Sequence, residues 1–135
     1  MPDAFWRGDL GRALRRESPW VRIVASYLTT APTAVATGLY YLPLPLLAHD
    51  IGCNVEIAKE AVAVLVRLDF CQYDAEEEIV WVFDTARAEF GEAIEPGGHR
   101  VGCIRALLQP YLHTRLGREW LAKHGRAYHC AQVSS

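Results

Sequence analysis

The chain has 135 residues, of which 51% are hydrophobic and 22% are charged. These proportions are typical of one globular domain and exclude an intrinsically disordered chain. No apolar run approaches the ~20 residues that a membrane-spanning helix needs, and residues 1–16 carry charges throughout, which excludes a secretory signal. The four cysteines are scattered without a C-x-x-C pair. We therefore expect a cytoplasmic protein with reduced thiols and no contact with a membrane.

Charge is distributed unevenly along the chain, although the net charge is only −2. Residues 1–28 carry five basic and three acidic side chains, and residues 99–135 carry six basic and one acidic side chain. Residues 29–98 carry three basic and twelve acidic side chains. An acidic middle between two basic ends bears on which partners the protein can bind.

The first predicted elements are a helix and a short strand. Ser18 and Pro19 are suited to a helix start, and apolar residues recur at helical spacing over residues 20–28. Residues 29–37 contain Pro32 and small polar side chains, which predicts a loop. Residues 38–42 are aromatic and bounded by glycine and proline, which predicts a strand.

A pair of helices follows. A short helix is predicted over residues 44–50, and Gly52 is free to take the left-handed conformation of a turn. Asn54 is expected to cap a longer helix over residues 55–68. Asp69 stands directly after this helix, where a left-handed residue is expected and glycine would be tolerated best.

The rest of the chain is predicted to form a hairpin and further helices. Strands are expected over residues 70–73 and 78–83, joined by an acidic turn over residues 74–77. Helical segments are expected over residues 85–90, 101–109 and 111–124.

The order of these elements is typical of a winged helix-turn-helix. The fold class is therefore predicted as mostly α with a small β-wing, an α+β fold with extra N- and C-terminal helices. Four segments follow from this assignment: an N-terminal arm or short helix over residues 1–17, a winged-helix core over 18–84, a C-terminal helical extension over 85–126 and a flexible tail over 127–135.

Residues in the core also follow a family pattern. The matching residues are Gly38-Leu39-Tyr40, Leu42-Pro43, Ala48, Asp50, Gly52, Ala61, Leu65, Tyr73-Asp74 and Val80-Trp81-Val82. With them, the run from Leu42 to Val82 resembles the N-terminal winged-helix domains of phage and prophage replication-initiator-type proteins. The resemblance implies a role associated with nucleic acid in a bacterial host cell, without catalysis of a reaction. Fold and function are separable, so the resemblance does not by itself establish DNA binding.

The predicted second helix departs from a DNA-reading helix. Its four charged residues sum to zero, and Ile57, Val64 and Val66 stand where polar side chains are usual. A helix that is apolar nearly all round is buried nearly all round. Either the chain's own C-terminal helices or a partner, such as a second copy or another protein, must cover the additional face.

The acidic turn and the basic ends favour different partners. Asp74, Glu76, Glu77 and Glu78 would repel phosphates, and they either form a solvated loop or dock on a basic protein groove. If DNA is bound, basic side chains must carry the binding. The candidates are Arg12, Arg15, Arg16, Arg22, Lys59, Arg67, Arg115, Arg118 and Lys123.

The sequence shows no sign of an active site. It contains neither a phosphate-binding G-x-x-x-x-G-K-[ST] loop nor a G-x-S-x-G elbow. Its histidines and cysteines lack the paired short spacings typical of zinc sites. We predict no enzyme activity, no catalytic residue, no cofactor, no metal and no small-molecule substrate.

Two hypotheses remain. The first is a non-enzymatic phage-type winged-helix protein that is associated with nucleic acid in replication or regulation, with direct DNA contact left open. The alternative is a protein-interaction module: a homodimer, or a phage-encoded, anti-CRISPR-like inhibitor of a host nucleic-acid machine. Such a module would use the acidic middle or the apolar helix face.

Overall fold

The computed structural model describes residues 12, 17–31 and 34–130. Within them, six α-helices, one short 3-10 helix and a three-stranded antiparallel sheet form an α+β fold. The elements are α3 (Pro19–Thr30), β1 (Leu39–Tyr41), α4 (Leu44–Ile51), α5 (Val55–Arg67), β2 (Cys71–Asp74), β3 (Ile79–Val82), α6 (Thr85–Phe90), α7 (His99–Leu108), η1 (Gln109–Tyr111) and α8 (Arg115–His124).

The predicted pair of helices at the centre of the chain is confirmed. Gly52 ends α4 in the left-handed conformation, with φ of 80°. The Asn54 side chain then accepts a hydrogen bond from the Ile57 amide at 2.9 Å and caps α5. Asp69 has φ of 63°, as expected for the residue that turns the chain from α5 into β2.

The sheet has the strand order β1-β3-β2, so β3 is central. Its four residues are all buried, but they alternate between two faces. Val80 and Val82 contact one group of buried residues, whereas Ile79 and Trp81 contact another. The sheet therefore separates two hydrophobic cores.

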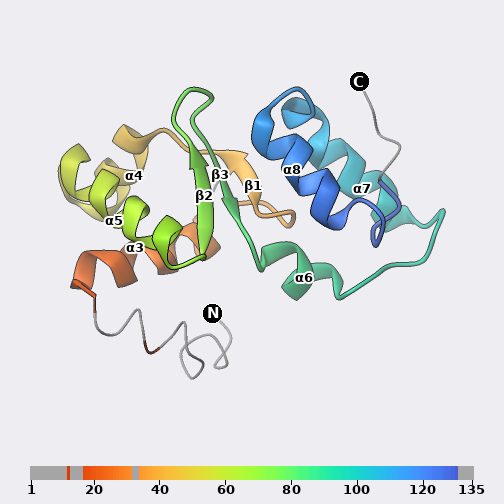
Figure 1. Ribbon diagram of the computed structural model, residues 1–135, viewed down its shortest axis with the longest axis horizontal. Coiled ribbons are helices and arrows are strands. Elements are labelled where there is room, and N and C mark those ends of the chain that lie inside the picture. The colour runs from red at the N-terminus through yellow and green to blue at the C-terminus, as the bar shows by residue number, and fades with distance from the viewer. Residues whose placement is uncertain (1–11, 13–16, 32–33, 131–135) are drawn as a thin grey trace.

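The first core lies between the sheet and the helices α3, α4 and α5 (Figure 1). Its members in α3 and α5 recur at i, i+3 or i+4, so each of these two helices buries one stripe, and α4 adds two adjacent residues. They are Val21, Val24, Ala25, Leu28, Leu47, Ala48, Ala58, Ala61, Val62 and Leu65.

The second core lies on the opposite face of the sheet, under α7 and α8 (Figure 1). Trp120 and Leu116 of α8 are fully buried there, together with Leu108 of α7. Tyr128 and Cys130 belong to the same core. The C-terminal half of the chain therefore packs against the sheet rather than against α5.

This arrangement corrects two predictions and decides one alternative that the sequence left open. The flexible tail expected from residue 127 is wrong for residues 127–130, because Tyr128 and Cys130 are 1% and 0% exposed; residues 131–135 lie outside the described part. The helix expected from residue 111 begins at Arg115, because Thr114 caps it. The C-terminal helices do not cover α5, because they occupy the other face of the sheet.

Candidate functional site

The acidic turn between β2 and β3 is ordered by its own first residue. One carboxylate oxygen of Asp74 accepts hydrogen bonds from the amides of Glu76 and Glu77, at 3.0 and 3.2 Å. Glu78 then takes a left-handed conformation with φ of 56°, and the chain returns into β3. This turn, capped by its own Asp74 side chain, leaves Glu76 and Glu77 exposed at the end of the β2–β3 hairpin.

A second structured segment, at the start of α8, lies opposite this turn. Thr114 is buried, and its hydroxyl donates to the Tyr111 carbonyl at 2.7 Å and accepts from the Gly117 amide at 3.0 Å. The Arg118 guanidinium donates to the His113 carbonyl at 2.8 Å. The Thr114 cap fixes the start of α8, and the bond to His113 holds the Arg118 side chain beside it.

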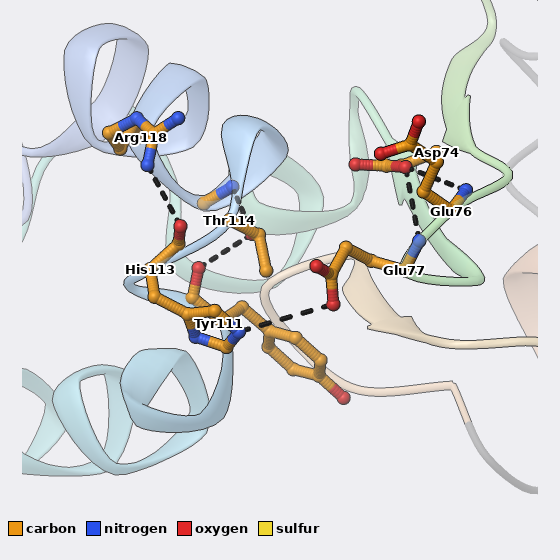
Figure 2. A network of polar contacts seen from close by, with 8 residues as sticks. Asp74, Glu76, Glu77, Tyr111, His113, Thr114 and Arg118 are labelled. Atoms are coloured by element: carbon orange, nitrogen blue, oxygen red, sulfur yellow. Dashed lines mark hydrogen bonds and ion pairs between the residues drawn. The ribbon is translucent and has the colours of Figure 1, made fainter.

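The two segments form an open cleft of about 470 Å³, which we call the charged cleft. Figure 2 shows the carboxylates on one wall and the residues at the start of α8 on the other. The lining residues are Tyr73, Asp74, Ala75, Glu76, Glu77, His113, Thr114, Arg115 and Arg118.

Electrostatic contact across the charged cleft is weak. His113 Nε2 lies 4.0 Å from a carboxylate oxygen of Glu77, and the two side chains are 68% and 49% exposed. Exposed pairs of this kind contribute roughly 0–1 kcal/mol, and this one requires a protonated imidazole. The cleft is therefore a charged surface exposed to solvent.

The structure brings together two groups of residues that the sequence analysis treated separately. Arg115 and Arg118, predicted to contact DNA, share the cleft with Asp74, Glu76 and Glu77, predicted to face a partner. Arg115 also forms an ion pair with Glu119 at 2.9 Å. Carboxylates beside these arginines would repel a phosphate backbone, so this end of α8 is poorly suited to bind one.

The other basic candidates lie elsewhere. Lys123 Nζ stands over the rings of Phe83 and Trp81, 5.1 and 5.6 Å from their centroids. Arg67, at the end of α5, lies 3.7 Å from Glu17. Lys59 is exposed on α5, Arg22 is half-buried on α3 and Arg12 is exposed. Arg15 and Arg16 lie outside the described residues.

The apolar candidates on α5 are half-buried. Val64 and Val66 pack against the first core, which accounts for part of the additional apolar face. Ile57 is half-buried near the start of the helix. The exposed residues of α5 are Val55, Glu56, Lys59, Glu60, Ala63 and Arg67. Their charges balance, so this face carries no net charge.

One contact between a cysteine and a histidine was not predicted from the sequence. Cys103 Sγ lies 3.3 Å from His99 Nε2 on the exposed side of α7. The i, i+4 spacing on a helix was the available signal. Within the described residues, no three His, Cys, Asp or Glu side chains converge as a metal site would require.

Comparisons of the chain with protein-family models, with curated proteins and with solved structures found no match. Among the described residues, no helix combines the length and the apolar character needed to cross a bilayer.

Proposed function

We propose that the chain is a non-enzymatic, phage-type winged-helix domain that acts in association with nucleic acid, in replication or regulation. The observation that carries the proposal is the order of the elements. A helix (α3), a strand (β1), two helices joined by a short turn (α4 and α5) and a hairpin (β2 and β3) succeed one another, and the strand order is β1-β3-β2. This order is the one expected of a winged helix, in which the acidic turn would form the tip of the wing.

The position of α5 in the proposed motif, rather than an excess of positive charge, selects the α3–α5 side as the contact surface, because the exposed charges of α5 balance. Arg115 and Arg118 share the charged cleft with carboxylates, and Lys123 lies over aromatic rings. Lys59 and Arg67 are exposed instead on α5, which would be the second helix of the proposed helix-turn-helix. In this motif the second helix contacts the groove, so these two cations are the proposed phosphate contacts.

The first test is binding of the full chain to labelled duplex and single-stranded DNA across a salt series. We expect affinity to fall with salt, and the double variant Lys59→Gln/Arg67→Gln to weaken binding and to lower the salt slope by about 2. The matched control is Arg100→Gln/Arg126→Gln, which removes the same charge from exposed positions in the C-terminal half.

The control separates specific contact from net charge. If both double variants weaken binding equally, the α3–α5 side is not the contact surface. If the wild-type protein does not bind at low salt, the association with DNA is wrong in any form that requires direct contact.

A second candidate is a protein-interaction module on the same fold, either a homodimer or an inhibitor of a nucleic-acid machine. It is favoured by the balanced charges on α5 and by exposed Leu46 and Val55, which are 37% and 40% exposed on α4 and α5. Apolar side chains beside a helix face without net charge suit a protein partner better than a phosphate backbone.

Solution mass decides the homodimer form of this candidate. Sedimentation should give a dimer, and Leu46→Asp and Val55→Asp should dissociate it. The variant Ala63→Asp tests in the same way whether the dimer contact includes the centre of the exposed α5 face. A monomer at all accessible concentrations excludes the homodimer. Loss of a partner's activity on charge reversal at Glu76 and Glu77 would point instead to the charged cleft.

A further inference from the structure

His124 is enclosed by aromatic rings at the contact between α8 and the sheet. Its ring centroid lies 4.9 Å from that of Trp120, 5.5 Å from that of Tyr128 and 6.3 Å from that of Trp81 on β3. The side chain is 9% exposed, and its Nε2 atom has no hydrogen-bond partner among the described residues. The same holds for Nε1 of Trp81. Two buried polar atoms therefore lie on neighbouring rings, one from the helix and one from the sheet.

This site accepts a neutral imidazole but disfavours an imidazolium. Burial in low dielectric disfavours a charge that lacks a hydrogen-bond partner. Burial, and to a lesser extent the charge of Lys123, lower the pKa of His124 from 6.5 to about 4, whereas Asp84 acts in the opposite direction.

The other elements around His124 supply little compensating charge. Residues 79–82 of β3 contain no titratable side chain. Tyr128, stacked on the imidazole, is neutral between pH 4 and 6.5, and burial raises its pKa further above the ordinary value of 10.0. Arg87 and Glu92 act on Tyr128 with opposite signs. Asp84 is thus the one acidic group that acts on His124 among the described residues.

The division into two cores limits what the loss of this contact would affect. α8 contributes Leu116 and Trp120 to the second core, whereas the first core is built from α3, α4, α5 and the other face of the sheet. Separation of α8 from the sheet would expose Leu39, Ile79 and Trp81. The packing of α3 against α5 would remain.

We propose that His124 is an acid-sensitive switch, whose protonation releases α8 from the sheet while the first core stays folded. Its folded-state pKa is the lower one, so the released state gains the proton as the pH falls from 6.5 towards 4. Release is therefore favoured by acid and suppressed above pH 6.5. It uncovers an apolar sheet face that is hidden at neutral pH.

Hydrogen exchange of the full chain tests this proposal. After correction for intrinsic exchange rates, the opening equilibrium of α8 amides should rise about 30-fold between pH 7.5 and pH 5.0, as the two pKa values require. The amides of α5 should change little. His124→Phe, which keeps an uncharged ring, should remove the response of α8. His113→Gln, at a histidine that is 68% exposed, should retain it.

Three outcomes would overturn the proposal. One is an equal response of α8 and α5, which would mean global unfolding. Another is a full response in His124→Phe, which would assign the effect to carboxylates. If that variant does not fold, the imidazole signals of the wild-type protein still decide, since a folded-state pKa of His124 at or above 6.5 contradicts the switch.

Discussion

The indole N–H of Trp120 donates a hydrogen bond to the backbone carbonyl of Thr37 at 2.9 Å and joins residues 83 positions apart in the chain. Both residues are fully buried. The Thr37 hydroxyl also accepts a hydrogen bond from the Leu39 amide, at 3.3 Å. One directional contact therefore fixes α8 relative to the turn that begins β1.

Replacement of Trp120 by phenylalanine should lower the free energy of unfolding by about 2–3 kcal/mol. The variant leaves the Thr37 carbonyl without its donor and opens a cavity in the second core. Urea denaturation measures the change. Trp20→Phe removes the same atoms from a half-buried position on α3 and should cost less than about 1 kcal/mol. Equal losses would show that Trp120 has no special role.

Gly117 and Gly102 offer a matched pair of helical glycines with opposite surroundings. A Cβ atom at Gly117 would lie 1.9 Å from the Tyr111 carbonyl oxygen, whereas a Cβ atom at Gly102 would meet nothing within 4 Å. We expect Gly117→Ala to cost about 3 kcal/mol or more, because α8 must move away from η1. Gly102→Ala should raise stability by about 0.5–1 kcal/mol through helix propensity. Thermal unfolding measures the stability of both variants. Changes in stability of the same sign would contradict this explanation.

Asp69 stands in the left-handed conformation that glycine adopts most easily, with φ of 63°. Asp69→Gly should therefore stabilise the protein by about 0.5 kcal/mol, and Asp69→Ala should destabilise it by about 1 kcal/mol. Chemical denaturation of both variants is the measurement. A stabilising alanine would mean that the backbone at this position relaxes out of the left-handed region.

The four free cysteines should react with a thiol reagent in a fixed order. Cys103 is exposed beside His99, and Cys53 is half-buried. Cys71 and Cys130 are buried, which raises the pKa of both thiols, that of Cys71 to about 12. With Ellman's reagent, the native protein should show a fast phase from Cys103 and a slower one from Cys53, and the other two should react only in denaturant.

Single variants assign the phases. Cys103→Ser should lose the fast phase, and Cys53→Ser should retain it. A native protein in which all four thiols react together would contradict the burial of the two cores.

Local structure could be predicted well from the sequence. Gly52 and Asn54 each act through their own backbone and nearest neighbours, so the turn and the cap were recognisable from residue type alone. The α+β class also followed, because hydrophobic periodicity identifies helices and strands one segment at a time.

Contacts between distant segments were decided only by the tertiary structure. The sequence shows an acidic turn and a basic helix about 40 residues apart as independent features, and only the packing of α8 on the sheet brings Glu77 and His113 within 4.0 Å. The same packing buries Tyr128 and Cys130 where position at the end of the chain predicted a flexible tail. Residue type and periodicity report which surface a segment must bury, but not which other segment covers it, because that choice depends on the combined packing of the whole chain.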